Sequence, residues 1–515
     1  MRLERSANAR KNMKWGLLNK LAFMIFPFVI RVLIIQCISI EFLGLDSLFI
    51  SVLQVLNLAE LGFSNAVVYH MYKPIADDDY DTLCALLNFY RRIYRYVGVF
   101  IGVVGVALLP FIPLFIHGDM PTQINCYVLY IIYLVNAVSS YWLYAYRQSL
   151  LDAYQKAYVT LNVNMVTTLV RYILQIIVLV FTGNCYLYAM LVIAGTIANN
   201  ITLNYYTRKL FPQIICQGVL DNNVKQDIKE KVKGLLIGKV SGMAISSCDS
   251  IFVSYFLGLT QTAIYNNYFM VMNGVIGFFL MIYSALTGGV GNSIAMDDRK
   301  TNYQNMLRLN FLYMWLAGVA VACFICLYQP FMEAVFGRDL LFPMEIVVCF
   351  AGFFYVMRIG DMLSVYSQAT GQWWKIRYVS IAQFFVNMTL NYVLGYFFGV
   401  AGIILASVFT MLSCNFLWGA SIVIGNCFNF GLGRYYRWHF TYMIVTAVVV
   451  FSTYQLVALL PFSGWWAFCT RLVLCLFVSN ILYMAIYRPT RMYRDTMPWI
   501  IERMPILAPL RKILI

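Results

Sequence analysis

Fourteen long apolar stretches run through this chain, and they limit what it can fold into more than any other feature. A helix needs about 20 mostly apolar residues to cross the hydrocarbon core of a bilayer, and each stretch reaches that length. The stretches lack the period-two alternation of barrel strands, so they indicate helices. The sequence therefore predicts an all-α polytopic membrane protein with about 14 transmembrane helices. The expected spans are 15–40, 43–71, 96–116, 123–146, 157–181, 185–206, 234–257, 262–287, 307–328, 343–366, 377–398, 400–424, 439–460 and 464–487.

Composition and charge agree with a membrane location. Hydrophobic residues make up 62% of the chain and charged residues 11%, against about 25% charged residues in a soluble domain. The net charge of +15 does not indicate nucleic acid, because 30 of the 37 Lys and Arg fall in alternate segments between the spans, and the opposite set of loops holds one, Arg338. Such asymmetry predicts cytoplasmic N- and C-termini.

A short internal echo suggests two related halves. GLL at 16–18 precedes Lys20, and GLL at 234–236 precedes Lys239, while FLGL at 42–45 recurs at 256–259. Transporters are often built from such repeats. The predicted organisation is 1–14 as a cytoplasmic N-terminus, 15–206 as a first six-helix half, 207–233 as a cytoplasmic linker, 234–424 as a second six-helix half, 439–487 as helices 13 and 14, and 488–515 as a basic amphipathic cytoplasmic tail.

Several charged residues lie inside the apolar stretches. A charge at mid-membrane costs at least about 2.5–3.5 kcal/mol on insertion scales, so it normally faces a cavity or a partner. Four basic residues are therefore candidate substrate-binding residues, and three acids are candidates for ion coupling or structural pairing. The bases are Arg31, Arg171, Lys239 and Arg358, and the acids are Glu60, Asp249 and Asp361.

Each basic candidate has an alternative interpretation. Arg31 follows Pro27, which should bend its helix beside a cavity, but Arg31 could instead pair with Glu60. Lys239 is close enough to a span end to extend toward the cytoplasmic surface. Arg358 and Asp361 are three residues apart on one helix face and could neutralise each other.

Polar neighbours at helical spacing around Arg171 suggest a hydrated face. They are Thr167, Thr168, Tyr172 and Gln175. A cavity and a structural pair explain Arg171 about equally well.

Catalytic and metal-binding patterns are not expected. The three His residues are far apart in sequence, and Cys323 and Cys326 fall within an apolar stretch, where two small buried residues explain them best. We therefore expect no catalytic residue, no metal and no cofactor, with H⁺ or Na⁺ as candidate coupling ions.

One block of sequence resembles a known family. It comprises LAELGFSNA at 58–66, YKPIA at 72–76, LLN at 86–88 and YRRIY at 90–94. This block resembles the O-antigen and capsule repeat-unit flippases, the polysaccharide branch of the multidrug/oligosaccharidyl-lipid/polysaccharide exporter superfamily. Two six-helix halves followed by two helices are also the plan of that superfamily.

The resemblance implies a flippase rather than an enzyme. Its cargo would be an undecaprenyl-diphosphate-linked oligosaccharide for lipopolysaccharide or capsule biosynthesis, and its partners would be membrane lipids and a polysaccharide polymerase. The four embedded cations fit a diphosphate, which needs compensating charge when it leaves water.

Two rival functions stay open. A cation-coupled multidrug exporter of the same superfamily should contain an acid-dominated cavity, whereas the embedded charges here are mostly basic. A membrane-embedded polysaccharide polymerase or transferase would usually bring a large outer loop or a His/Asp cluster.

Overall fold

A computed structural model describes residues 26–57, 63–116, 124–154, 156–370, 376–459 and 465–503, together with 509 and 511. These residues form helices and connecting turns, with no strand among them. The chain divides into two compact units, Met1–Asn266 and Asn267–Ile515, and each is described by itself.

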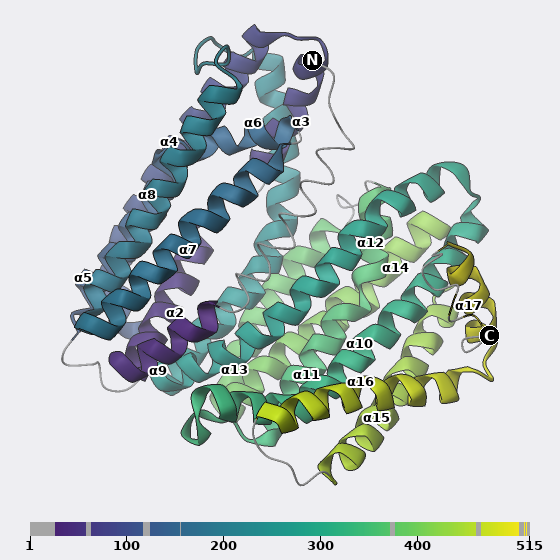
Figure 1. Ribbon diagram of the computed structural model, residues 1–515. Coiled ribbons are helices and arrows are strands. Elements are labelled where there is room, and N and C mark those ends of the chain that lie inside the picture. Colours follow the sequence, from purple (N-terminus) through teal and green to yellow (C-terminus); the bar gives the residue numbers. More distant parts are fainter. Residues whose placement is uncertain are drawn as a thin grey trace. The chain divides into compact units, whose positions relative to one another are not determined.

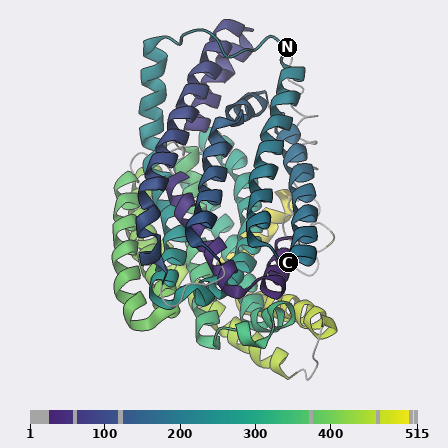
Figure 2. The same ribbon diagram turned by 90° about the vertical axis from the view of Figure 1, so that its left-hand side faces the viewer.

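The first unit is built on four long helices that pack side by side, α4, α5, α7 and α8 (Figures 1 and 2). Its helices are Phe26–Cys37, α2 (Ile40–Leu56), α3 (Phe63–Ala76), α4 (Tyr80–Leu108), the 3₁₀ helix η2 (Leu109–Phe115), α5 (Cys126–Trp142), η3 (Ala145–Arg147), α6 (Gln148–Ala153), α7 (Ala157–Thr182), α8 (Cys185–Leu210) and the first part of α9 (Asn222–Met296).

The second unit is organised around α10, which packs against α11, α15 and α16 (Figure 1). Its elements are the rest of α9, α10 (Arg299–Phe336), η4 (Arg338–Leu340), α11 (Met344–Ile359), α12 (Asp361–Ala369), α13 (Arg377–Thr410), the π-helical segment η6 (Met411–Gly419), α14 (Ala420–Val423), a second π-helical segment η7 (Ile424–Phe428), α15 (Gly433–Ala458), α16 (Trp465–Tyr487) and α17 (Arg491–Arg503).

Side-chain caps define where several helices begin. The Asn125 side chain accepts hydrogen bonds from the backbone N–H groups that open α5, and Asn184 does the same for α8. These bonds satisfy donors that no earlier turn can satisfy. Gly183 ends α7 with a φ of 58°, in the left-handed region that glycine adopts most easily.

The predicted fold class is confirmed. Among the described residues, nine helices are long and apolar enough to cross a membrane, or ten if the bent pair Cys126–Trp142 and Ala145–Ala153 is one span. The longest, Arg377–Phe428, has 52 residues and would extend about 78 Å as one straight helix, more than twice the hydrocarbon thickness. Gly399 breaks it with a φ of 58°, inside the connection expected between spans 377–398 and 400–424.

Two expected spans differ from the helices that form. Within the expected span 43–71, residues 43–56 belong to α2 and residues 63–71 to α3, while residues 58–62 lie outside the described part of the chain. Residues 96–115 are the later part of α4 and η2. Helix α4 begins much earlier, at Tyr80, because Asp79 caps it and the basic residues that follow are good helix formers.

The C-terminal helix α17 is amphipathic, and its apolar side packs against the rest of the second unit. Met492, Met497 and Ile501 are buried, while Arg491 and Arg494 are exposed. Trp499 receives a cation–π contact from Arg308 of α10 at 5.6 Å. Residues 1–14 and 504–508 lie outside the described part of the chain, and the expected division into halves, linker and tail stays a prediction.

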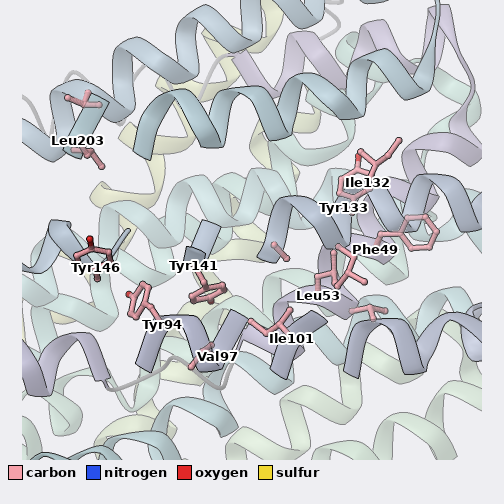
Figure 3. Close-up of a cluster of buried hydrophobic side chains, with 14 of the residues drawn as sticks. Phe49, Leu53, Tyr94, Val97, Ile101, Ile132, Tyr133, Tyr141, Tyr146 and Leu203 are labelled. Atoms are coloured by element: carbon pink, nitrogen blue, oxygen red, sulfur yellow. The ribbon is translucent and has the colours of Figure 1, made fainter. Parts of the chain in front are cut away.

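A continuous apolar cluster holds the first unit together (Figure 3). Near Tyr94 and Tyr141, whose ring centroids are 5.5 Å apart, it borders a polar pocket. Toward Phe49 and Tyr133 it borders a buried charge. The core therefore lies between a polar pocket and a buried acidic residue.

Candidate functional site

A pocket of about 520 Å³ opens among α4, α5, α6, α7 and α8, entirely within the first unit. This volume lies in the range of about 300–1,000 Å³ that is typical of small-molecule sites. Fifteen residues line the pocket, and most of them carry neutral hydrogen-bonding groups. The hydroxyl and amide side chains are Ser140, Ser149, Thr167, Thr168, Thr196, Gln148, Asn164, Asn199 and Asn200, and the phenol side chains are Tyr90, Tyr94 and Tyr141.

Arg171 is the one charged residue among these fifteen, and none of them is a carboxylate. Its guanidinium lies 5.1 Å from the ring centroid of the adjacent Tyr172, whose ring stacks on Phe26 at 5.7 Å. Helix α8 approaches closely here, because a Cβ atom on Gly195 would stand 2.7 Å from the Arg171 Cδ. The absence of a side chain at Gly195 therefore leaves room for the Arg171 stem.

Hydrogen bonds between helices fix the polar wall. The Thr167 hydroxyl of α7 donates to Asn199 Oδ1 of α8 at 3.0 Å. Asn200 Nδ2 reaches the Ser140 carbonyl at 3.3 Å. These bonds hold part of the lining in place before any ligand arrives, which lowers the ordering cost of binding.

A buried charge cluster adjoins the pocket through Arg171. Asp46 on α2 is 8% exposed and accepts a hydrogen bond from the Tyr133 hydroxyl of α5. Both Arg31 and Arg171 act electrostatically on this carboxylate. Arg31 also donates to the Ser47 hydroxyl at 3.2 Å. Arg171 thus belongs to the pocket wall and to the surroundings of Asp46.

The second unit contains its own charge cluster. Arg358 Nη1 lies 2.9 Å from Asp361 Oδ2, with the Arg358 side chain 4% exposed and Asp361 20% exposed. The Tyr313 hydroxyl donates to the same carboxylate at 2.5 Å. The rings of Phe279 and Phe354 lie 5.9 and 5.6 Å from the guanidinium. Arg358 and Asp361 therefore form an ion pair, which is the neutralising pair that their spacing of three residues suggested.

Of the three remaining predicted site residues, Asp249 is the one whose side chain the structure describes. Asp249 on α9 is 1% exposed, and Tyr265 donates to its carboxylate at 3.4 Å. Glu60 lies outside the described residues. Lys239 lies on α9, and its side chain is outside the described part of the structure.

Sequence reasoning missed Asp46 and most of the pocket wall. Asp46 stands only three residues into the expected span 43–71, where an acid resembles an ordinary interfacial residue. The Asn and Thr residues of the wall come from two helices, α7 and α8, so no single stretch of sequence reveals them. The polar spacing around Arg171 was the available signal, since Thr167 and Thr168 also line the pocket.

The fold and the pocket together define a polytopic membrane protein with a polar cavity in one helical unit. No family model and no curated protein matches the sequence. Solved structures do match the fold. An inward-facing multidrug resistance MATE family transporter of the MOP superfamily aligns with a TM-score of 0.61 and 14% identity, over 79% of this chain and 98% of that chain.

Two further structures give similar values. The lipid II flippase MurJ, in an inward closed conformation, aligns with a TM-score of 0.60 and 15% identity over 92% of this chain and 99% of that chain. A substituted form of the MATE transporter VcmN of Vibrio cholerae aligns with a TM-score of 0.57 and 15% identity over 81% of this chain and 96% of that chain. At these identities the likeness establishes the fold, which is that of MATE transporters and MurJ.

Proposed function

We propose that this protein is a flippase for an undecaprenyl-diphosphate-linked oligosaccharide. It would move the headgroup from the inner to the outer leaflet of the bacterial cytoplasmic membrane, for biosynthesis of O-antigen or capsule. The observation that carries the proposal is the pocket of the first unit, whose lining combines hydroxyl, amide and phenol groups with one arginine and no carboxylate.

This lining has the chemistry that a sugar headgroup requires. Sugar hydroxyls both donate and accept hydrogen bonds, and the Asn, Gln, Ser and Thr side chains of the wall can do the same. The tyrosines offer ring surfaces for the apolar faces of a sugar. Arg171 supplies a planar cation for a phosphate or an acidic sugar, and such charge-assisted bonds are about twice as strong as neutral ones.

The polyprenyl chain would stay in lipid while the headgroup crosses. Rocking of the two units around the headgroup would provide alternating access, as in other transporters built from two halves. Arg31, Lys239 and Arg358 are proposed as further cations for the diphosphate. Glu60, Asp249 and Asp361 are proposed for coupling to H⁺ or Na⁺, or for structural pairing.

The structural comparisons add support for lipid-linked cargo. The match to the lipid II flippase covers 92% of this chain, compared with 79% and 81% for the two MATE transporters. The rival function, a cation-coupled multidrug exporter, is favoured by the equally good fold match to a MATE transporter. A carboxylate-free pocket is a poor site for cationic drugs, because nothing in its lining offsets their charge.

Proteoliposomes test the two functions directly. A fluorescent polyprenyl-diphosphate oligosaccharide would be placed in both leaflets, and a membrane-impermeant quencher would report the fraction that becomes accessible with time. The proposal expects protein-dependent crossing of this lipid and no accumulation of cationic dyes in the same vesicles. Dye accumulation without lipid crossing would assign the chain to drug export instead.

A further inference from the structure

Arg147 is buried at a position where the sequence predicts a surface arginine. It follows the expected span 123–146, in a segment between spans that the charge asymmetry predicts to be cytoplasmic. Its exposed fraction is nevertheless 4%. Arg208 and Lys209, in the last turn of α8, are exposed, as basic residues at a membrane surface should be. A guanidinium stays charged at every physiological pH, so a buried one needs hydrogen-bond acceptors or an opposite charge.

A bend in the chain brings Arg147 inside the first unit. The segment Ala145–Ala153 is bent by 43° from α5. Tyr144 at the bend has a φ of 60°, a left-handed conformation that is strained for a tyrosine. Gln148 and Ser149, directly after Arg147, line the polar pocket. The bend therefore places Arg147 beside the pocket and away from the surface.

Within the described part of the chain, the Arg147 guanidinium is not neutralised. Its Nε and Nη1 atoms, which carry most of its N–H donors, have no hydrogen-bond partner there. Asp152, the nearest acid in sequence, is hydrogen-bonded to Gln148 instead, and Arg147 is not among the groups that act on it. Arg358 in the second unit is different, because Asp361 Oδ2 lies 2.9 Å from its Nη1.

Two more buried polar atoms without a described partner lie just beyond the pocket lining. On α7 the Thr160 hydroxyl is about one helical turn before Asn164, which lines the pocket. On α8 the Asn204 Oδ1 atom is about one turn after Asn200, which also lines it. Helix α7 begins at the end of the unit where α8 finishes, so both steps lead out of the pocket in the same direction.

Arg147, Thr160 and Asn204 come from elements that pack on one another. The 3₁₀ helix η3 contacts α8, and α6, which follows η3 directly, contacts both α7 and α8. Figure 3 shows Tyr146 and Leu203, the residues before Arg147 and Asn204, at the same end of the apolar cluster. Three neighbouring elements thus direct buried polar groups toward one end of the pocket.

We infer that Arg147, Thr160 and Asn204 form a second subsite, which continues the pocket toward this end of the unit and binds a phosphoryl group of the cargo. The planar guanidinium matches phosphate oxygens, and the Thr160 hydroxyl donates to the same group. The Asn204 oxygen accepts a hydrogen bond from a sugar hydroxyl beside it. The inference rests on the proposed function and deepens it, because it names where the phosphate of the headgroup is held.

The position of the subsite suits a phosphate that is attached to a lipid. Phosphates of inner-leaflet lipids lie at the cytoplasmic surface of the hydrocarbon core, and the sequence predicts this end of the unit to be cytoplasmic. Helix α7 rises about 16 Å between Thr160 and Arg171. The subsite and Arg171 therefore hold different parts of the cargo, with the sugars extending from the phosphate into the pocket.

Calorimetric titration of the purified full-length chain in detergent tests the subsite, with farnesyl diphosphate as the probe. Arg147→Met should bind the probe about tenfold or more weakly than wild type, because a charge-assisted bond is lost. Arg147→Lys should fall between the two, since lysine keeps the charge but not the planar donor geometry. Arg208→Met, the same substitution at an exposed position, is the matched control and should bind like wild type.

The melting temperature without ligand separates recognition from a structural role. Arg147→Met should melt at or above the wild-type temperature, because it removes a buried charge that has no counter-charge. A clearly lower melting temperature would show that the guanidinium stabilises the fold through a contact of its own, and would overturn the inference. Wild-type affinity in Arg147→Met would overturn it as well, and would leave the flippase proposal intact, since that proposal depends on lipid crossing.

Two further arms complete the test. If Arg147→Met cannot be purified, Thr160→Val removes only the hydroxyl, and it should weaken binding by about two- to tenfold; unchanged binding would count against the subsite. Inorganic pyrophosphate in place of the farnesyl compound distinguishes the source of the phosphate. Arg147-dependent binding of both probes supports a site for the phosphate alone, and binding of farnesyl diphosphate only supports a site for a lipid-attached phosphate. Binding of neither probe by wild type would overturn the inference.

Discussion

Gly44 of α2 lies directly against the backbone of Leu259 in α9. A Cβ atom at position 44 would stand 2.7 Å from the Leu259 carbonyl carbon and 2.9 Å from its Cα. These residues belong to the two FLGL segments, 42–45 and 256–259, that echo each other in the sequence. Gly258, just before the contact, has a φ of 84° and breaks α9 there. Both glycines of the echo therefore have a structural reason: one allows close approach, and the other allows the break.

Gly44→Ala should destabilise the first unit. The new methyl group meets backbone atoms that cannot rotate away, and overpacking of this kind costs about 1–3 kcal/mol. We expect a lower apparent melting temperature in detergent, measured by tryptophan fluorescence. Gly352→Ala on α11 is the matched control, because a Cβ there meets nothing within 4 Å. An equal effect of the two substitutions would contradict the contact.

Asp361→Asn should destabilise the second unit, because it leaves Arg358 as a buried cation without its counter-charge. Removing one partner of a buried pair typically costs about 3–5 kcal/mol, and the partial exposure of Asp361 favours the lower end. Adding Arg358→Met should recover most of this loss, which the same melting measurement would detect. A double variant no more stable than Asp361→Asn would show that the pair is not what the single substitution breaks.

Asp79→Ala should loosen the start of α4. The Asp79 carboxylate accepts a hydrogen bond from the Thr82 backbone N–H at 2.9 Å. The hydrogen bonds to Thr82 hold the pKa of Asp79 below its ordinary value. The ionised cap therefore contributes stability above its unfolded pKa, and this contribution is lost as the pH falls through the lowered pKa.

Hydrogen exchange would measure this cap locally. In Asp79→Ala the amides of the first turn of α4 should exchange faster, corresponding to a loss of about 1 kcal/mol. Asp79→Asn should keep most of the protection at neutral pH, since asparagine also caps helices. It should also keep it in acid, where the carboxylate is lost.

Asn199→Leu should separate sugar recognition from diphosphate recognition. Asn199 lines the pocket and accepts the Thr167 hydroxyl. Leucine cannot bond to a sugar hydroxyl, and a sugar group left buried without its hydrogen bond costs about 1–3 kcal/mol, whereas Thr167 still has the Val163 carbonyl as an acceptor at 2.8 Å. Crossing of the lipid-linked oligosaccharide should slow by about tenfold or more, while crossing of a sugar-free polyprenyl diphosphate should change less. Equal slowing of both lipids would place Asn199 outside sugar recognition.

The sequence was most informative where one helix carries the whole signal. Apolar length was enough to predict the helical membrane fold, and the connection expected near Gly399 exists because glycine tolerates the positive φ found there. Arg358 and Asp361 are three residues apart, so their pairing was visible from spacing alone. Asp46 could not be found in this way, because Tyr133, 87 positions away, and Arg171 reach it only through tertiary packing.

The measurement closest to the central claim is the rate at which a fluorescent polyprenyl-diphosphate oligosaccharide crosses proteoliposomes, compared between Arg171→Gln and Arg471→Gln. Both substitutions remove an arginine from an apolar helix, but Arg471 on α16 is not among the residues that line the pocket. Loss of a charge-assisted bond of about 1.5–3 kcal/mol should slow Arg171→Gln by about tenfold or more, with Arg471→Gln near the wild-type rate. Wild-type crossing by Arg171→Gln would contradict a role for this pocket in carrying the headgroup.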